Sequence, residues 1–215
     1  MRELNAYIDH TLLKAEATEA DVRRLCEEAR QYGFYAVCVS SGRVALCREA
    51  LEGSGVKIAA TVGFPLGSAA TGAKAAEAAL AVAAGAAEID MVMDIGAMKE
   101  GCGRRLRQDI EAVVAAAAPA IVKVILETCL LTEEEVVRAC LLAKEAGAAF
   151  VKTSTGFSTG GATARHVRLM RETVGESMGV KASGGIRTRA AALEMIEAGA
   201  DRIGASASVA IVTGE

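Results

Sequence analysis

Several residue types are scarce in this 215-residue sequence, and their scarcity narrows the possible folds and functions. Tryptophan is absent, aromatic residues make up 3% of the chain, and there are two prolines. Hydrophobic residues nevertheless reach 52%, and much of that share is alanine and valine. A chain of this size can bury one sizeable core. Alanine-rich helices packed on valine- and isoleucine-rich strands give such a composition.

The features of nucleic-acid-binding, membrane and metal proteins are also missing. The net charge is −3 and no basic block interleaves with aromatic residues, so nucleic acid is not expected as a partner. No apolar run approaches the ~20 residues that cross a bilayer, so no membrane association is expected. The two histidines, His10 and His166, are far apart, and together with scattered cysteines they do not indicate a metal site.

The six cysteines form no CxxC pair, and most of them lie inside apolar runs. We interpret them as small core residues of a protein in a reducing compartment. This interpretation predicts a cytoplasmic location. The cysteines are Cys26, Cys38, Cys47, Cys102, Cys129 and Cys140.

Strand-like and helix-like segments alternate along the chain, which predicts parallel strands joined by helical crossovers. The strands read as nearly continuous apolar runs, as expected for parallel strands covered on both faces. We expect strands at 7–10, 34–39, 56–62, 88–93, 121–126, 149–152, 180–182 and 202–204. We expect helices at 19–32, 71–84, 104–118, 133–146, 163–174 and 188–198, a short helix ending near Gly53, and a final short one after Ser206.

Eight such units predict an α/β fold, a single-domain (β/α)8 TIM barrel that spans residues 1–215. The alternative is a doubly wound open sheet. Against it, no GxGxxG follows the first strand, and polar residues gather at many strand ends. An Ala-Gly-Ala sequence recurs at 84–86, 146–148 and 198–200, which favours a repeated helix-to-strand turn. No domain boundary or linker is evident.

Four expected strands carry an ionisable residue inside an apolar run: Asp90, Lys123, Lys152 and Lys181. In a barrel such side chains can meet across the interior, and polar residues at the C-terminal strand ends line the active-site mouth. The carboxylate offsets part of the lysines' desolvation, while repulsion among the lysines keeps at least one pKa low. A fall of ~3 units from ~10.4 is needed for a free amine at neutral pH. Such an amine attacks carbonyl compounds.

Each of these residues also has a purely structural reading. Lys152 could snorkel to water from its strand end. Asp90 and Lys123 could form an ion pair that fills the barrel interior. Lys181 could be a surface lysine after Gly179, although it leads directly into the turn that begins at Ser183.

Two glycine-rich loops follow consecutive strands late in the chain. They are Ser183-Gly184-Gly185-Ile186-Arg187 and Gly204-Ala205-Ser206, and the second opens a short helix. Loops in this position are the usual phosphate site of the barrel, where backbone N–H groups and a helix N-terminus hold the anion. The alternative is two tight turns with nothing bound.

Together, these strand and loop residues resemble those of the class I, Schiff-base-forming deoxyribose-phosphate aldolases. The resemblance extends over nearly the whole chain in the family's order, and the segments around Lys152 and Lys181 are its most specific part. The matching segments are 7–13, 88–92, 123–128, Val151-Lys152-Thr153-Ser154-Thr155-Gly156, Lys181-Ala182-Ser183-Gly184-Gly185-Ile186-Arg187 and 204–206.

The resemblance implies a role for each matching residue. Lys152 would form the Schiff base, Lys181 would lower the pKa of Lys152, and Asp90 would act as acid and base. Lys123 matches a further lysine that lines the family's site. The implied phosphate binders are Gly156, Gly184, Gly185, Gly204 and Ser206.

Three positions depart from similar members of the family. Asp94 stands where asparagine is expected, Phe157 where some members have lysine, and Ala207 where some have a second serine. The changes at 157 and 207 are expected to loosen phosphate binding, and Asp94 to alter the local charge.

The resemblance implies reversible cleavage of 2-deoxy-D-ribose 5-phosphate to acetaldehyde and D-glyceraldehyde 3-phosphate, in deoxyribonucleotide and carbohydrate catabolism. It implies neither a metal nor an organic cofactor. The expected partners are the phosphosugar, acetaldehyde and further copies of the chain in a homo-dimer or homo-tetramer.

Two other functions stay open at the level of the sequence. The same barrel could carry a phosphosugar isomerase or epimerase, because phosphate loops do not dictate the chemistry. Such an enzyme needs a carboxylate or histidine base rather than a buried lysine pair. The chain could also be a binding protein that has kept the site and lost turnover.

Overall fold

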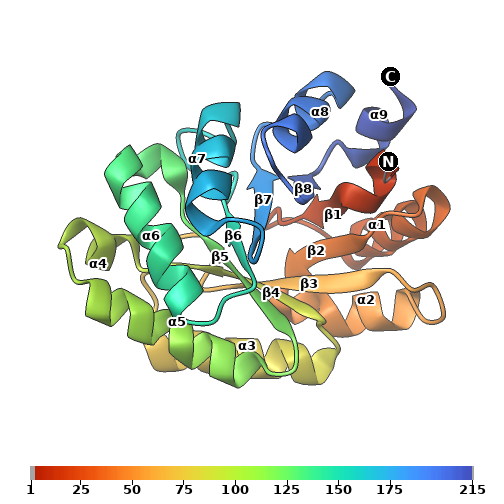
Figure 1. Cartoon of the computed structure of the whole chain (residues 1–215). Coiled ribbons are helices and arrows are strands. Elements are labelled where there is room, and N and C mark those ends of the chain that lie inside the picture. The colour runs from red at the N-terminus through yellow and green to blue at the C-terminus, as the bar shows by residue number, and fades with distance from the viewer. Residues whose placement is uncertain (1–2, 215) are drawn as a thin grey trace.

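In the computed structural model, which describes residues 3–214, eight parallel strands close into one barrel with helices on its outside (Figure 1). Neighbouring strands pair in sequence order, and β8 pairs with β1 to close the ring. The predicted (β/α)8 fold is therefore confirmed, while residues 1, 2 and 215 lie outside the described residues. The strands are β1 (Ile8–Leu12), β2 (Ala36–Ser40), β3 (Lys57–Val62), β4 (Glu88–Val92), β5 (Ile121–Ile125), β6 (Phe150–Lys152), β7 (Gly179–Ser183) and β8 (Arg202–Ala205).

The helices follow the strands as predicted, and two of them, Glu19–Tyr32 and Thr71–Ala84, begin and end at the predicted residues. The structure adds short elements that are too brief to show a helical period: η1 (Leu4–Tyr7), η2 (Ser41–Arg43), η3 (Thr128–Leu130) and α4 (Ile95–Lys99). The other helices are α1 (Glu19–Tyr32), α2 (Val44–Ala50), α3 (Thr71–Ala84), α5 (Gly103–Ala117), α6 (Glu133–Glu145), α7 (Ala164–Val174), α8 (Arg189–Glu197) and α9 (Ser208–Thr213).

Threonines fix where several helices begin. Thr18 and Thr132 form capping boxes, in which the threonine hydroxyl accepts from the N3 backbone N–H and the N3 carboxylate accepts from the cap N–H. Gly33, at φ 63°, ends α1 in the left-handed conformation that glycine adopts without strain. Each threonine cap stabilises its helix by about 1 kcal/mol. The helix ends were predictable because local side chains determine them.

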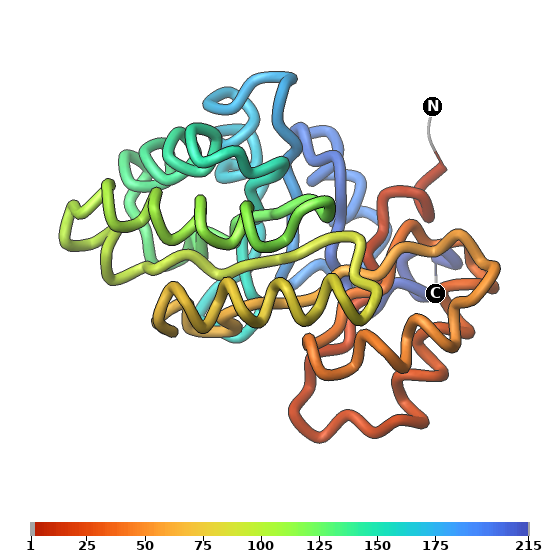
Figure 2. Tube along the Cα trace, turned by 90° about the horizontal axis from the view of Figure 1, so that it is seen from below, coloured from red at the N-terminus to blue at the C-terminus, as the bar shows by residue number. Residues whose placement is uncertain are grey.

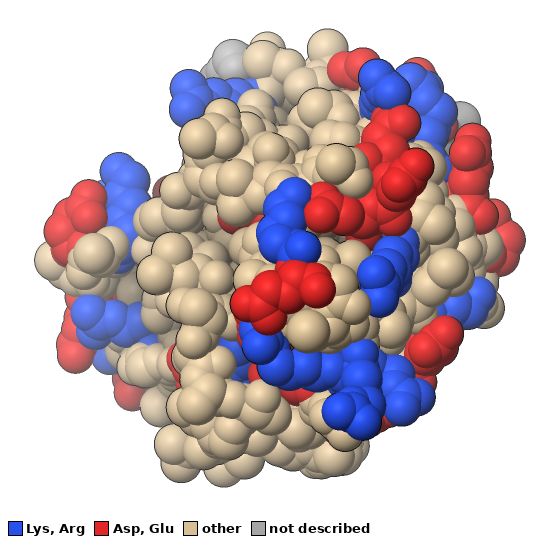
Figure 3. Space-filling view, turned by 90° about the vertical axis from the view of Figure 1, so that its left-hand side faces the viewer, with Lys and Arg blue, Asp and Glu red and all other residues tan. Residues whose placement is uncertain are grey.

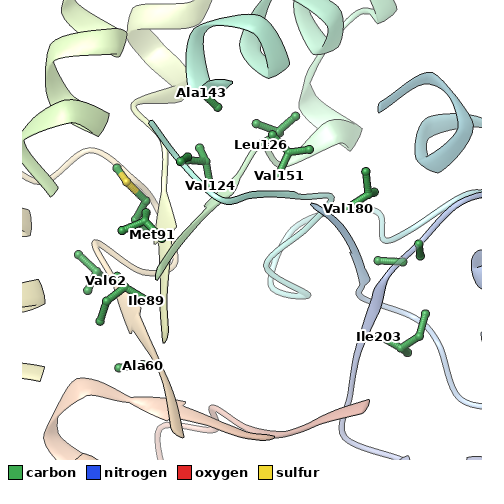
Figure 4. Close-up of a cluster of buried hydrophobic side chains, with 14 of the residues drawn as sticks. Ala60, Val62, Ile89, Met91, Val124, Leu126, Ala143, Val151, Val180 and Ile203 are labelled. Atoms are coloured by element: carbon green, nitrogen blue, oxygen red, sulfur yellow. The ribbon is translucent and has the colours of Figure 1, made fainter. Parts of the chain in front are cut away.

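The main hydrophobic core lies between the barrel and the helices. Figure 4 shows Ile89, Met91, Val124, Val151 and Val180 pointing outward from the ring of strands. Successive side chains of a strand point to opposite faces. The residues that alternate with these, including the four predicted charges, therefore face the barrel interior.

The helix layer, outside the barrel interior, contains a buried ion pair between Lys74 and Asp109. Helices α3 and α5 run side by side beneath the barrel (Figure 2). Between them the ammonium of Lys74 donates to Asp109 Oδ2 at 2.8 Å and to the Val92 carbonyl at 3.0 Å. Asp109 also accepts from the Thr71 hydroxyl at 2.8 Å. This ion pair joins two helices to the end of β4.

Figure 3 shows one side of the molecule, on which basic and acidic side chains are interspersed. An area without charged side chains lies along the lower edge of this view. Among residues 3–214, no helix combines the length and apolar character that a membrane span needs. All six cysteines are free thiols, and Cys26, Cys38, Cys47 and Cys140 are buried. The interpretation as core residues is confirmed for these four and is wrong for Cys102, which is exposed, and for Cys129, which is half-buried.

Candidate active site

The four charges predicted from the strands meet inside the barrel around Asp90. Lys152 and Lys181 each place Nζ on Asp90 Oδ2, at 2.8 and 2.7 Å, and Lys123 Nζ lies 2.6 Å from Oδ1. The strand register explains the arrangement, since Asp90 pairs with Lys123 and Lys152 pairs with Lys181 on neighbouring strands. The carboxylate thus holds three lysine nitrogens within hydrogen-bonding distance.

A further set of charges, which the sequence analysis missed, supports this cluster. Asp9 on β1 accepts from Lys181 and from Arg202, whose Nε lies 2.9 Å from Asp9 Oδ1. Glu88 accepts from Arg202 at 3.0 Å and lies 2.5 Å from Lys123. Charged residues on strands were the available signal, but Glu88 and Arg202 begin their strands and Asp9 lies in a very short run.

Cations outnumber carboxylates in this buried cluster. The cations are Lys123, Lys152, Lys181 and Arg202, four in all, and the carboxylates are Asp9, Glu88 and Asp90, three in all; each of the seven is at most 3% exposed. Desolvation penalises every uncompensated charge in such a place. The cluster therefore contains one more basic side chain than its carboxylates can pair one to one.

The pKa directions inside the cluster show which groups keep their charge. Burial raises the pKa of Asp90, but Lys123, Lys152 and Lys181 outweigh it and hold that pKa well below its usual range. Burial lowers the pKa of Lys181, but Asp9 and Asp90 outweigh it and raise that pKa above its ordinary value. Asp90 and Lys181 are therefore both charged at neutral pH.

The remaining ionisable group beside Asp90 stays neutral. The Cys38 thiol lies 3.9 Å from Asp90 Oδ2. Burial and the Asp90 charge raise the pKa of this thiol. It adds no negative charge to the cluster, so the excess of cations stands.

The structural readings of the two key lysines do not describe this molecule. Lys181 is fully buried, so it is not a surface lysine, and Lys152 is 2% exposed, so it does not extend to bulk water. Lys123 and Asp90 do form the ion pair that was considered as an alternative, but as part of the larger cluster. The two lysine nitrogens share one carboxylate oxygen, as a coupled pair requires.

Lys152 lines a cavity of about 290 Å³ at the C-terminal end of the strands, with Asp90 and Lys181 buried behind it. The mouth also presents two basic side chains, Lys14 and Arg187. All five predicted phosphate-binding residues line this cavity: Gly156, Gly184, Gly185, Gly204 and Ser206. The structure thus brings the predicted amine and the predicted anion site into one space.

Two of these glycines are required by close packing. A Cβ on Gly204 would lie 3.0 Å from Lys181 Cε, so the glycine leaves room for that side chain. Gly184 adopts φ +87°, and its carbonyl would lie 2.2 Å from a Cβ on Gly161. The segment after β6 that carries Gly161 therefore packs backbone against backbone on the glycine loop after β7.

The three departures from the family pattern fall in different places. Asp94 accepts from Ala97 N at 3.0 Å as the N-cap of α4 and pairs with Arg105, so it serves a helix start. Phe157 lines the cavity and packs edge-on against Phe64, with ring centroids 5.2 Å apart. Ala207 precedes α9. The expected effect of residues 157 and 207 on phosphate affinity stays a prediction.

A buried amine that opens into a cavity, backed by excess positive charge, is suited to attack a carbonyl carbon and form an imine. The glycine loops that line the same cavity can hold an anionic group of the same molecule. The arrangement therefore fits a substrate with a carbonyl group at one end and a phosphate at the other.

Comparison with known proteins points in the same direction. Residues 4–214 match the model of the DeoC/LacD family aldolases. The deoxyribose-phosphate aldolase of Alkaliphilus oremlandii is 61% identical over 210 residues, which cover 97% of this chain and 95% of that protein. That of Clostridium novyi is 58% identical over 212 residues, covering 98% and 96%.

A solved structure agrees over nearly the same length. The deoxyribose phosphate aldolase from Aeropyrum pernix, described as a unique tetramer, superposes with a TM-score of 0.93 at 36% identity. The match covers 98% of this chain and 90% of that one. The similarity therefore extends over the whole barrel and is not restricted to its catalytic loops.

Proposed function

The chain belongs to the DeoC/LacD aldolase family, and from this premise we propose that it cleaves 2-deoxy-D-ribose 5-phosphate reversibly to acetaldehyde and D-glyceraldehyde 3-phosphate. One observation carries the proposal: the Lys152 amine lines the cavity and shares an oxygen of Asp90 with Lys181. An aldolase of the Schiff-base type needs one uncharged amine at the substrate, and the excess of cations supplies a reason for it.

In the proposed reaction Lys152 Nζ attacks the C1 aldehyde and, after loss of water, forms an iminium. The electron pair of the C2–C3 bond moves into this iminium, which leaves an enamine on Lys152 and releases D-glyceraldehyde 3-phosphate. Protonation of the enamine at C2 and hydrolysis then release acetaldehyde and restore the amine. The covalent step divides one difficult cleavage into easier ones.

Cleavage also requires loss of the C3 hydroxyl proton. We assign its acceptance to Asp90, acting through a water molecule. Lys123, Lys152 and Lys181 hold the pKa of Asp90 well below its usual range, so its carboxylate is ionised and able to accept. Lys181, which contacts the same carboxylate oxygen, is placed to return a proton during the carbinolamine and enamine steps. Lys123 holds the other oxygen and fixes the orientation of the carboxylate.

The phosphate is assigned to the glycine loops. Backbone N–H groups near Gly184 and Gly204 and the side chain of Ser206 would hold it, with Lys14 and Arg187 nearby in the same lining. Fixing the far end of the sugar orients C3 toward the reacting side chains.

An isomerase or epimerase is the weaker proposal. Such enzymes place a carboxylate or histidine base against the substrate, whereas the group beside this cavity is an amine. A binding protein without turnover is disfavoured because Asp90, Lys152 and Lys181 keep the contacts that the chemistry needs.

Two further predictions accompany the activity. We propose a homo-dimer or homo-tetramer, supported by the exposed face of α3, where Leu80 is 72% exposed among alanines. Light scattering of the purified protein measures this directly. A cytoplasmic location agrees with the free thiols but stays a prediction.

Reduction with borohydride in the presence of acetaldehyde tests the proposed function. The expected result is a stable ethyl adduct on Lys152, located by mass mapping of peptides, and complete loss of turnover and adduct in Lys152→Ala. An adduct that persists in this variant would assign the nucleophile to another residue. A wild-type protein that forms no adduct while it converts phosphosugars would favour the isomerase.

A further inference from the structure

We propose that Glu127 is a positioning residue that sets the shape of the loop after β6, and through it the phosphate end of the cavity. The inference deepens the proposed function and rests on it. Glu127 does not line the cavity, and it lies in the loop after β5 rather than in the loop after β6. Its effect on the cavity is therefore indirect. Three observations carry it: a strained backbone, a buried carboxylate without a cation, and a directed chain of hydrogen bonds.

The backbone at Glu127 is unusual. Among residues 3–214 it is the only non-glycine residue at positive φ, 56°. A left-handed conformation costs an L-residue with a side chain roughly 1–2 kcal/mol. On either side the chain stays paired with β6, since Leu126 N donates to Lys152 O and Thr128 N to Thr153 O, both at 2.9 Å. The strain is therefore held in place between two bonds to the strand that carries Lys152.

The Glu127 side chain is 2% exposed. Its partners are the Thr155 amide at 3.2 and 3.4 Å, the Thr155 hydroxyl, and the Cys129 thiol at 3.9 Å. None of these partners is a cation, in contrast to the carboxylates of the barrel interior. We infer that a side chain buried in this way serves as a hydrogen-bond acceptor that fixes the position of its donors.

The direction of the hydrogen bonds follows from the chemistry of the groups. The Thr155 hydroxyl donates its one proton to a carboxyl oxygen of Glu127. The hydroxyl oxygen then presents its lone pairs to the Phe157 amide, which lies 3.0 Å away. The chain Phe157 N–H to Thr155 Oγ1–H to Glu127 closes the backbone around Gly156, which adopts φ +84°.

This closed loop forms one wall of the cavity. Thr155, Gly156 and Phe157 all line it, and a Cβ on Gly156 would lie 3.9 Å from Gly184 Cα in the facing glycine loop. Glu127 thus controls how the loop after β6 faces the loop after β7. The backbone groups that would surround a phosphate depend on that spacing.

The variant Glu127→Gln tests the inference. It keeps the size of the side chain but replaces one acceptor with an N–H donor, which competes with Phe157 N for the Thr155 hydroxyl. We expect the KM for deoxyribose 5-phosphate and the Kd for inorganic phosphate to rise about tenfold, the scale of one hydrogen bond to a charged group. The kcat/KM for unphosphorylated deoxyribose should stay within about twofold.

A matched control and a second variant keep the experiment decisive. Glu135→Gln makes the same change in a carboxylate that accepts from the Thr132 amide at the start of α6, away from the cavity. We expect wild-type KM values for both sugars in this control. Glu127→Gly removes the carboxylate and relieves the left-handed strain. It should fold and show the same selective loss of phosphate affinity.

Several outcomes would overturn the inference. They are equal losses on both sugars, an unchanged Kd for inorganic phosphate, a wild-type protein that binds no inorganic phosphate, or failure of both Glu127 variants to fold. The phosphate titration needs no turnover, whereas the proposed function fails on the acetaldehyde adduct. Failure of one is therefore distinguishable from failure of the other.

Discussion

Two regions of this molecule bury a lysine completely, and only one of them makes a candidate nucleophile. In the helix layer Lys74 meets one carboxylate, Asp109, and a backbone carbonyl, and it lines none of the cavities described for residues 3–214. In the barrel Lys152 belongs to a cluster of four cations and three carboxylates and lines the cavity.

Burial alone therefore does not make a reactive amine. In the one-to-one ion pair of the helix layer, the carboxylate repays part of the desolvation of the lysine. In the barrel the basic side chains outnumber the carboxylates by one, and Lys152 is the amine that lines the cavity. The difference between the two regions lies in charge balance and access, and each of these can be altered separately.

The largest expected effect comes from restoring charge balance in the barrel. Lys181→Met changes the cluster to three cations and three carboxylates and removes the ammonium that shares Asp90 Oδ2 with Lys152. We expect kcat/KM at neutral pH to fall by about 10²–10³, within the range typical of a positioned proton-transfer group. The acid limb of the pH–rate profile should move to higher pH. A profile with an unmoved acid limb would contradict the charge-balance explanation.

The same substitution in the other region should damage stability instead of chemistry. Lys74→Met leaves Asp109 buried without its cation, which costs about 3 kcal/mol of unfolding free energy. Denaturant unfolding measures this loss, and kcat/KM of the folded fraction should stay within about twofold. Adding Asp109→Leu should recover part of the stability. A rate loss as large as that of Lys181→Met would erase the proposed difference between the regions.

The smallest effect concerns acid. Burial raises the pKa of Asp9, but Lys181, Arg202 and Lys123 outweigh it and lower that pKa to about 2. A carboxyl group with a lowered folded pKa stabilises the fold above its unfolded value, and this stability is lost as the pH falls. We expect a loss of about 2 kcal/mol between about pH 4 and pH 2. In Asp9→Asn the loss of unfolding free energy across that range should be smaller by this amount, while the other carboxyl groups with a lowered pKa, such as Asp90, keep their contribution.

Much of the fold was predictable because its signals are local. Thr18 and Gly33 mark both ends of α1 within the sequence itself, and the apolar strands alternate with helices at regular spacing. The cluster around Asp90 was predictable for a related reason: a charge inside an apolar strand stands out, and a barrel brings such charges together.

Other parts of the site could not be predicted because they depend on contacts between distant segments. Arg202 begins β8, where a charged residue is ordinary, and its importance comes only from contacts with Asp9 and Glu88. Glu127 follows β5, and its link to Thr155 depends on the pairing of β5 with β6 continuing past the strand ends. No period or motif reports that register.

The pairing of Lys152 with Lys181 on neighbouring strands has a consequence for the layout of the cavity. Ser183, where the glycine loop begins, lies two residues beyond Lys181 on β7, which places it about 7 Å further along the strand. The backbone that carries the paired lysines and the loop that begins the predicted anion site therefore lie at successive levels along one strand and open into one cavity.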